Sequence, residues 1–396
     1  MKKLGLFFLA CLAYGQTIPA PGPGVFAVAA TTWPNGYTSQ YAFTIQSGQV
    51  PATQSNFPLL VCPNGSNGCN LTITGLGAQF ESSSCYDAIW TADSTGSSSA
   101  SNLPFELVAN SCNTSTGQVE WWVSPSSVTA GMTIYLYVGN ASVTTNQGWP
   151  TTGSSPWPSF YQAVYHMGGQ STLNTNDSTG NGNNGSGNVD VSATTGNIEG
   201  AVAFANNNTQ KVDVGNGSTL NFTGNVDYAF EMWVNNQDTN TNWVTSALLS
   251  KYIGTGPNGY SVYATHACGG GYNTFFLDVF SAGTESYFIV GANFLRNTWY
   301  HLVVTVFGGV AAIYVNGVSQ SDCAESGSYA VGSVSNDLWL GARDDTSTYP
   351  MDGYLDEVRI SHTIASNVIT ANWVSLEYNN QSSQSAFWSV VGPTLP

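Results

Sequence analysis

The most conspicuous shortage in this sequence is charge, and above all positive charge. Only 8% of the 396 residues are charged, with seven Lys or Arg against 23 Asp or Glu, whereas about a quarter of the residues are charged in an average globular protein. No Lys or Arg occurs between residues 16 and 210. So acidic a chain repels nucleic acid and anionic membranes, and we expect neither as a partner.

Beyond residue 15 the sequence also lacks a long apolar run, so it predicts no membrane span. The one such run, Leu4–Leu12, follows two lysines and precedes Ala13–Gly15, a pattern typical of a signal peptide cleaved before Gln16. Its removal leaves five cations against 23 acidic residues, a net charge of −18. We expect an exported bacterial protein, secreted or displayed at the cell surface; acylation at Cys11 is an alternative means of attachment.

Cysteine is scarce but even in number after processing, which indicates disulfides in an exported chain. The expected disulfides are Cys62–Cys69, Cys85–Cys112 and Cys268–Cys323. The first two close short loops, although two other pairings of these four cysteines are open, and the third joins the only cysteines of the second half. A zinc site is the competing interpretation, which the wide spacing of the first pair and the lack of a nearby His disfavour.

No helical period is sustained along the chain, and short apolar or alternating runs recur between Gly, Asn, Ser and Pro clusters. This pattern predicts an all-β chain with an N-terminal β-sandwich-like domain. The expected segments are a signal peptide (1–15), a small all-β domain (16–145), a linker (146–159), a jelly roll (160–380) and a C-terminal tail (381–396). The linker is rich in Gly, Pro, Ser and Thr, so we expect few contacts across it and a second domain that folds alone.

The second half carries a series of segments whose order and spacing are characteristic. They are Ala163–His166, Asp177–Gly182, Gly200–Phe204, Phe230–Val234, Trp299–Val304, Ile313–Gly317, Leu340–Arg343 and Gly353–Ile360. In these segments the chain resembles the bacterial laminin-G-like, concanavalin A-like jelly rolls, from residue 160 to about 380. The resemblance implies the fold and leaves the function open, because lectins, adhesion modules and glucanases share it.

The first half is similar to a small β-domain of unknown function that often precedes such jelly rolls. The segments that carry this likeness are Tyr86–Trp90, Leu103–Leu107, Val119–Val123 and Ile134–Asn140. It supports the domain boundary and implies no activity.

The sequence lacks the residue patterns that are typical of catalytic sites. Glucanases of this class use a Glu-x-Asp-x-x-Glu strand, which does not occur here, and the adjacent Asp356 and Glu357 should point to opposite faces of a strand. The arginines are isolated from one another, so no cluster for an acidic sugar is expected. No nucleophile elbow accompanies the four histidines, of which His301 is expected to be a packing residue. The sequence therefore predicts a protein that is not an enzyme.

Aromatic residues are the most promising ligand groups. Trp339, Tyr349 and Tyr354 flank the acidic turn Asp344-Asp345, and we expect them at a rim where a sugar can stack. We therefore predict a binding or adhesion protein whose partner is an extracellular glycan or another cell-surface molecule. A structural surface or matrix component without sugar binding is the alternative, and a glycan-active hydrolase is a weaker one. A groove lined by exposed aromatic and polar groups would favour binding.

A structural calcium ion is a further expectation. Asn174–Asn188 is too polar to pack, yet the resemblance places it inside a folded domain, and a hard cation can hold such a loop. Asp177 is the expected ligand, with Asp356 or Glu357 meeting it if the domain's first and last strands are neighbours. The acidic turn with Asp352 is the alternative site. Without metal, Asp177 would form an Asx turn.

Overall fold

The computed structural model describes most of the chain beyond the expected signal peptide. The described residues are 32–97, 102–169, 171–206, 209–238, 244–254, 257–265, 274–291, 294–343, 349–363 and 368–396. Residues 1–15, with Cys11, therefore lie outside the described part. Within that part, no helix is long and apolar enough to cross a membrane.

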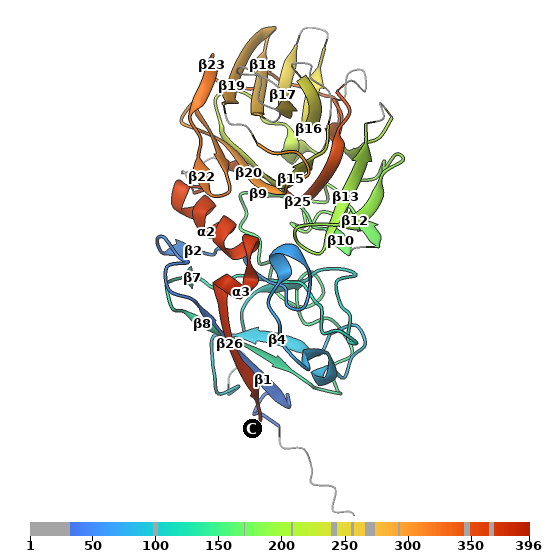
Figure 1. Ribbon diagram of the computed structural model, residues 1–396, viewed down its shortest axis with the longest axis vertical. Coiled ribbons are helices and arrows are strands. Elements are labelled where there is room, and N and C mark those ends of the chain that lie inside the picture. The colour runs from blue at the N-terminus through green and yellow to red at the C-terminus, as the bar shows by residue number, and fades with distance from the viewer. Residues whose placement is uncertain are drawn as a thin grey trace, which may run out of the picture. The chain divides into compact units, whose positions relative to one another are not determined.

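The all-β prediction is confirmed, and residues from 161 onward form two large antiparallel sheets (Figure 1). The larger has the strand order β12-β13-β25-β15-β20-β21-β22, with β9 also paired to β25. Its strands are β9 (Tyr161–Tyr165), β12 (Ser192–Thr195), β13 (Gly200–Ala205), β15 (Asp227–Asn236), β20 (Tyr300–Phe307), β21 (Val310–Val315), β22 (Val318–Ser319) and β25 (Asp352–Thr363). The smaller sheet has the order β14-β24-β16-β17-β18-β19-β23. Its strands are β14 (Val212–Gly215), β16 (Val244–Ile253), β17 (Asn258–Thr265), β18 (Thr274–Ser281), β19 (Thr284–Val290), β23 (Asp322–Ser326) and β24 (Leu338–Leu340).

Local chemistry explains this jelly roll well. β21 and β22 are joined by Asn316 and Gly317, with φ of 51° and 77°, the two positive values that a tight hairpin turn requires. Along β15, Phe230 and Met232 face the core between the sheets, whereas Trp233 belongs to a different core on the outer face. That alternation is the expected period of a strand. The jelly roll thus has apolar groups on both faces of its larger sheet.

The first domain is built from smaller sheets. A four-stranded sheet has the order β26-β1-β8-β4, a three-stranded sheet the order β3-β6-β5, and β2 pairs with β7. These strands are β1 (Ser39–Ile45), β2 (Gln54–Ser55), β3 (Leu59–Val61), β4 (Ala88–Thr91), β5 (Phe105–Leu107), β6 (Trp121–Val123), β7 (Ser127–Val128), β8 (Thr133–Val138) and β26 (Trp388–Thr394). The remaining short elements belong to none of these sheets. They are η1 (Asn67–Cys69), η2 (Leu76–Gln79), β10 (Met167–Gly169), β11 (Thr172–Asn174) and η4 (Ser218–Leu220).

Two of the three expected disulfides are confirmed. Cys62 is bonded to Cys69, and Cys85 to Cys112. Cys323 is also disulfide-bonded. Its predicted partner, Cys268, lies outside the described residues, so that pairing stays a prediction.

Residues 381–396 do not form the tail that the sequence suggested. The chain continues from α2 (Ala371–Ser382) through α3 (Gln384–Phe387) into β26, which pairs with β1 of the first domain (Figure 1). Only Trp388 of β26 is buried, at 1% exposure, and the rest of the strand is largely exposed. A strand with one buried side chain shows no alternating pattern, so the sequence gives no sign of it.

Helix α2 packs on two sides at once. Its N-cap is Thr370, whose hydroxyl accepts a hydrogen bond of 3.4 Å from the Trp373 amide. Trp373 and Leu376 join the core of the first domain, while Glu377 reaches Arg359 on the outer face of the larger sheet. Because buried residues lie on several sides of the helix, no amphipathic period marks it in the sequence.

The expected linker, residues 146–159, is packed rather than loose. Trp157 is only 5% exposed, and the backbone amide of Trp149 donates to the carbonyl of Phe105. One cluster of buried residues includes Trp121 of the first domain and Val303 of the jelly roll. The Gly, Pro and Ser content of residues 146–159 suggested a flexible linker, but Trp149 and Trp157 anchor this segment to the first domain. The reason for expecting the second domain to fold alone is therefore lost.

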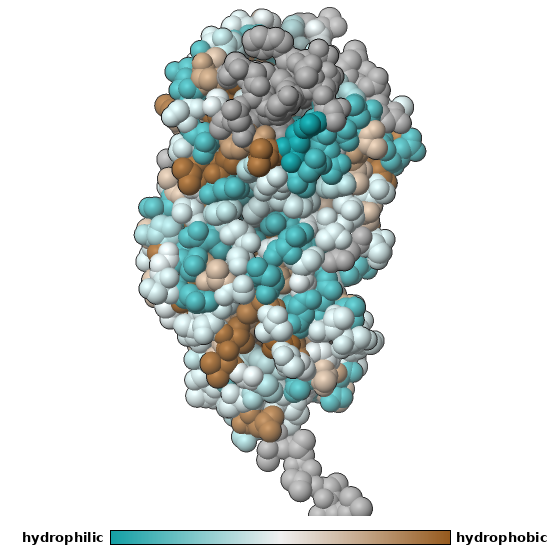
Figure 2. All heavy atoms as spheres, in the orientation of Figure 1, coloured by the Kyte–Doolittle hydropathy of each residue, from teal (hydrophilic) through white to brown (hydrophobic). Residues whose placement is uncertain are grey.

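The surface matches the shortage of charge in the sequence. On the face shown in Figure 2, the described residues are mostly hydrophilic or neutral, and hydrophobic residues form separate small patches. With 8% charged residues, this polarity comes mainly from uncharged side chains.

Candidate functional site

A cleft of about 600 Å³ opens where the first domain meets the jelly roll. Its lining residues come from the stretches 83–86 and 106–112 of the first domain, 146–150 of the packed segment and 174–180 of the jelly roll, together with His166, although not every residue of these stretches lines it. The aromatic and amide side chains that line it are Tyr86, Asn110, Asn146, Trp149, Asn174 and Asn176. None of these six residues is buried, so the cleft presents them to a ligand.

Asp177 orders the polar loop at one side of the cleft. Its carboxylate accepts hydrogen bonds from the backbone amides of Val164 (3.2 Å), Thr179 (2.9 Å) and Asn183 (3.0 Å). The bond to the residue two positions on is that of an Asx turn, the metal-free interpretation of this loop. The described residues thus show how a Gly- and Asn-rich segment is held by one carboxylate and main-chain donors.

The expected calcium ligands are not brought together. The structure has one group of three or more close metal-ligand atoms among its described residues, and it contains Glu357 but neither Asp177 nor Asp356. Of the alternative site, Asp344 and Asp345 lie outside the described residues. The described residues therefore give the expected calcium site no support, because the Asp177 carboxylate accepts amide donors and forms no cluster with Asp356 or Glu357.

Trp149 is fixed in place along the same side of the cleft. Its indole Nε1 donates a 2.8 Å hydrogen bond to the carbonyl of Ser178. A Cβ atom at Gly180 would come within 2.9 Å of the indole ring, so the loop packs directly against it. The ring is thus held by the loop that Asp177 orders, while part of it stays accessible.

Glu106 and His166 lie where the cleft reaches the interior. Glu106 in β5 is 7% exposed and accepts hydrogen bonds from Ser178 Oγ (2.7 Å) and Trp157 Nε1 (2.6 Å). His166, which follows β9, has its Nε2 3.6 Å from Glu106 Oε2. Its ring stacks on Trp122 with ring centroids 5.7 Å apart. An acidic and a basic group thus meet behind the accessible lining.

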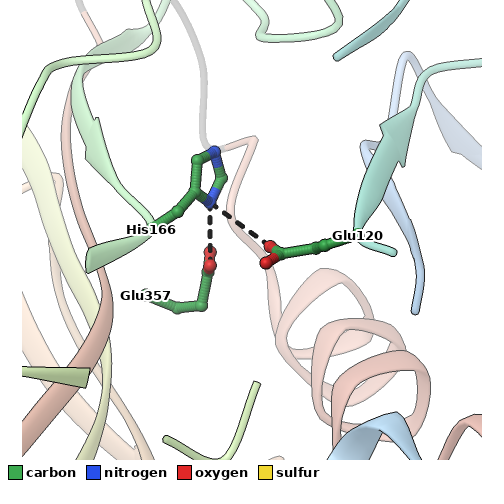
Figure 3. Close-up of side chains that lie close together, drawn as sticks. All are labelled: Glu120, His166 and Glu357. Carbon is green, nitrogen blue, oxygen red and sulfur yellow. Dashed lines mark hydrogen bonds and ion pairs between the residues drawn. The ribbon is translucent and has the colours of Figure 1, made fainter. Parts of the chain in front are cut away.

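Two further carboxylates lie on the other side of the His166 ring (Figure 3). His166 Nδ1 is 2.7 Å from Glu357 Oε1 and 3.7 Å from Glu120 Oε1. Burial and the nearby Glu357 raise the pKa of Glu120 well above its usual range. Burial alone would lower the pKa of His166, but Glu357 and Glu106 outweigh it and raise that pKa well above its usual range. Without a metal ion, these carboxylates therefore favour the protonated form of His166.

A β-bulge at Glu357 corrects the expectation about this strand. The pairing of β25 with β15 shifts between Glu231 and Trp233, and Glu357 has φ of 51°. Bulges interrupt the alternation of side chains, so Asp356 and Glu357 do not take opposite faces as predicted. They lie close enough that Glu357, after burial, raises the pKa of Asp356.

Arg359 is the central cation of the junction. Its Nη1 donates to Glu377 Oε1 (2.6 Å) and its Nη2 to Glu357 Oε2 (2.9 Å). Glu231 Oε2 lies 3.8 Å from Nη1. The guanidinium carbon sits 4.3 Å from the centroid of the Trp122 ring, within the range of a cation–π contact. Side chains of both domains and of α2 therefore meet around one buried arginine.

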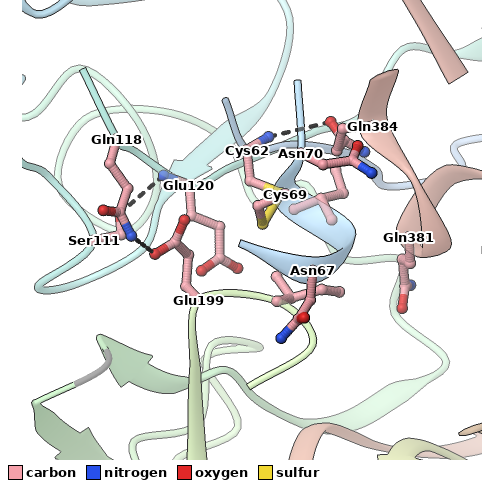
Figure 4. The surroundings of a disulfide bond; sticks show 12 residues. Cys62, Asn67, Cys69, Asn70, Ser111, Gln118, Glu120, Glu199, Gln381 and Gln384 are labelled. Carbon is pink, nitrogen blue, oxygen red and sulfur yellow. Dashed lines mark hydrogen bonds between the residues drawn. A yellow bond between two sulfur atoms is a disulfide. The ribbon is translucent and has the colours of Figure 1, made fainter. Parts of the chain in front are cut away.

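A second, smaller cavity of about 400 Å³ lies beside the first and shares Ser83, Asn110 and Cys112 with it. Glu199 lines it and accepts a hydrogen bond from the side chain of Gln118 (Figure 4). Burial raises the pKa of Glu199 to about 7. Glu199 thus continues the series of buried acidic residues from the cleft toward the loop that the Cys62–Cys69 disulfide closes (Figure 4).

The described residues of the rim predicted from the sequence do not line the cleft; they are Trp339, Tyr349 and Tyr354. Lys211 Nζ covers the ring of Trp339, 3.1 Å from its centroid. The guanidinium carbon of Arg343 lies 4.6 Å from the ring centroid of Tyr349. Tyr354 is half-buried in β25. Their role in ligand binding stays a prediction.

The residues that line the cleft and its acidic interior were not singled out from the sequence, apart from Asp177 and Glu357. A usable signal exists in the short stretches Phe105–Leu107 and Phe230–Met232, where a glutamate stands between two large apolar residues. In a chain with so few charges, an acid inside an apolar strand needs a buried partner. That signal would have pointed to Glu106 and Glu231.

Comparison with known proteins agrees with the fold. Residues 206–368 match a laminin-G-like family model, described as the Concanavalin A-like lectin/glucanases superfamily. The match confirms the resemblance for this part of the chain, and with it the class of domain. No curated protein matches the chain.

Several solved structures are similar at low identity. One is Domain 4 of AbnA, a GH43 extracellular arabinanase from Geobacillus stearothermophilus, in complex with arabinotriose, with 20% identity and a TM-score of 0.39 over 54% of this chain and 96% of that one. Another is the binding domain of Paraclostridial Mosquitocidal Protein 1, with 14% identity and a TM-score of 0.43 over 55% of this chain and 51% of that one. A third is the Ruminococcus gnavus IT-sialidase CBM40, with 11% identity and a TM-score of 0.30 over 40% of this chain and 84% of that one. The chain thus spans about half the length of the mosquitocidal domain.

Proposed function

We propose that this chain is an exported bacterial binding protein, secreted or held at the cell surface, whose cleft binds an extracellular glycan. The observation that carries the proposal is the pairing of two accessible aromatic rings, Tyr86 and Trp149, with four asparagine side chains around one cleft of about 600 Å³. The family match supports a binding role, because lectins are among the members that its description names.

The lining suits the chemistry of a neutral sugar. A pyranose has an apolar C–H face that packs on an aromatic ring, and its hydroxyls both donate and accept hydrogen bonds. Trp149 and Tyr86 supply the rings, and each asparagine amide offers both donors and acceptors. Among the described lining residues there is no Lys or Arg to pair with an acidic sugar. We therefore expect a neutral glycan, held in a pocket of the size typical for small ligands.

Binding without hydrolysis is favoured by the state of the two cleft carboxylates. Glu106 accepts hydrogen bonds at both oxygens, from Ser178 and Trp157. Asp177 likewise accepts bonds at both oxygens, from Val164 and Asn183 among others. A general acid must carry a proton to the leaving group, and a nucleophile needs a free lone pair toward the sugar. Both carboxylates are thus engaged by protein donors, which is consistent with a role in positioning the lining.

The binding proposal is tested with the full chain on an array of neutral glycans, followed by calorimetry on the strongest ligand. Trp149→Ala and Tyr86→Ala should each weaken binding at least about tenfold, which corresponds to about 1.4 kcal/mol. Trp339→Ala is the matched control, because Trp339 is a half-buried tryptophan outside the cleft. It should leave the affinity unchanged.

The outcomes separate the competing functions. Loss of binding in Trp339→Ala but not in Trp149→Ala would place the ligand at the rim predicted from the sequence. Absence of binding to any glycan on the array would favour the structural alternative. Release of reducing sugar from a bound glycan would contradict the non-enzymatic assignment.

Export is checked separately by intact mass, since the mature chain should begin at Gln16, or at a lipid-modified Cys11 for a lipoprotein.

A further inference from the structure

Three potential metal ligands converge at the junction of the two domains, behind the cleft. The ligand atoms of Glu120, His166 and Glu357 all lie within 4.8 Å of one another. The three residues are 0%, 4% and 1% exposed. Figure 3 shows that both carboxylates point at the same edge of the imidazole ring. They come from three separate parts of the fold, because Glu120 precedes β6, His166 follows β9 and Glu357 is in β25.

The cluster has unused bonding capacity. Glu120 Oε2 and His166 Nε2 are buried and have no hydrogen-bond partner among the described residues. A buried polar atom without a partner costs about 1–3 kcal/mol, and more for a charged group. Glu120 Oε1, the oxygen 3.7 Å from His166 Nδ1, already accepts a 2.9 Å bond from Trp122 Nε1, whereas Oε2 of the same carboxylate has no partner among the described residues. Such an atom is an observation in favour of a ligand at this place.

The charges at the junction are also unbalanced. Glu106, Glu120 and Glu357 surround His166, and Arg359, which pairs with Glu357, is also shared with Glu231 and Glu377. Among the described residues, five carboxylates therefore lie around Arg359 and His166. Buried carboxylates must be paired, protonated or bound to a metal. A divalent cation would neutralise two of them at once.

We propose that Glu120, His166 and Glu357 form a binding site for one divalent transition-metal ion, with zinc as the best match. Zinc takes imidazole nitrogen and carboxylate oxygen together, and in sites with three protein ligands a water molecule takes the fourth position. Calcium prefers six to eight oxygen ligands, which this set does not provide.

The surroundings have the features of an outer coordination shell. Glu106 lies 3.6 Å from His166 Nε2, the ring nitrogen that a metal on Nδ1 would leave free. Trp122 and Arg359 hold one oxygen each of Glu120 and Glu357. Partners of this kind fix the orientation of metal ligands. Because the ligands belong to both domains, the ion ties the first domain to the jelly roll and supports the inner end of the cleft.

The test uses the full chain and the metals themselves. We expect purified protein to carry close to one equivalent of zinc by mass spectrometry of its elements. After chelation and dialysis, added zinc should raise the melting temperature by several degrees, because an ion that binds only the folded state stabilises it by mass action. Calcium at the same concentration should produce no such shift. Cobalt(II) should give the visible absorption of a low-coordinate site.

Variants locate the ion. Glu120→Gln and His166→Gln should abolish the zinc-induced shift, whereas the control Glu377→Gln should keep one equivalent, since Glu377 is equally buried but outside the cluster. If the ligand variants do not fold, the titrations of the unmodified chain decide. The proposal is overturned if the folded chain holds no stoichiometric metal and shows no shift with zinc or cobalt. It is equally overturned if binding survives in both ligand variants.

Discussion

Replacing Arg359 by methionine should destabilise the folded chain by about 3–5 kcal/mol, the cost of removing one partner of a buried ion pair. Arg359 is 1% exposed and hydrogen-bonds Glu357 and Glu377 at 2.9 and 2.6 Å. Methionine keeps much of the contact with Trp122 but leaves these carboxylates buried without their cation. Burial alone would raise the pKa of Glu377, yet His301 and then Arg359 lower it to about 2, so this carboxylate stays charged.

The assay is urea unfolding followed by tryptophan fluorescence, with the free energy extrapolated to water. Arg296→Met is the matched control, because Arg296 is only partly buried and its change should stay within about 1 kcal/mol. Adding Glu377→Gln to the Arg359→Met variant should recover part of the loss, since it removes one of the charges that Arg359 had paired. The reasoning is refuted if Arg359→Met costs no more than the Arg296 control, or if the double variant is no more stable than the single one.

Two further predictions concern β18 and β26. Burial and Glu285 raise the pKa of Asp278 in β18 to about 8, against the opposing effect of Arg343. Between about pH 4 and 8 the folded state therefore binds more protons than the unfolded state. The stability of the fold consequently falls as the pH rises through this range. Asp278→Asn should flatten that fall in melting temperatures measured from pH 5 to 9, and a profile parallel to the unmodified chain would contradict the assignment. Deleting residues 388–396 should cost at least about 3 kcal/mol, because Trp388 is 1% exposed and losing a buried tryptophan costs about 3–5 kcal/mol. Urea midpoints equal to those of a chain lacking only residues 395 and 396 would show that β26 is dispensable.

The jelly roll was predictable because its strands carry local information. The turn at Asn316-Gly317 and the strand segment Phe230–Val234 in β15 each follow from neighbouring residues. The packing of helix α2 and the pairing of strand β26 were not predictable in the same way, since the neighbours of both elements are distant in the sequence. Asn380 of α2 bonds both the amide and the carbonyl of Leu60, about 320 positions away. Only the folded chain reveals that such a helix is buried on several sides.

The candidate site was less accessible to sequence reasoning than the fold. Glu106, Glu120, His166 and Glu357 span some 250 positions, and no spacing rule connects them. The bulge at Glu357 also overrides the simple alternation that assigned adjacent side chains to opposite faces. The cleft at the domain junction nevertheless has the accessible aromatic and polar lining that would favour binding over a purely structural role.

The pairing of β26 with β1 bears on how the protein responds to mechanical load. The two strands are antiparallel, with Gln40 opposite Thr394 at one end of the ladder and Ile45 opposite Trp388 at the other. Tension applied through the segments that flank residues 39 and 394 therefore acts on the same end of the ladder. It peels the hydrogen bonds apart one after another, the weak direction of a β-ladder, instead of shearing them all together. Under a pull on both ends, β26 would separate first, and the two sheets of the jelly roll would bear the load only after it had detached.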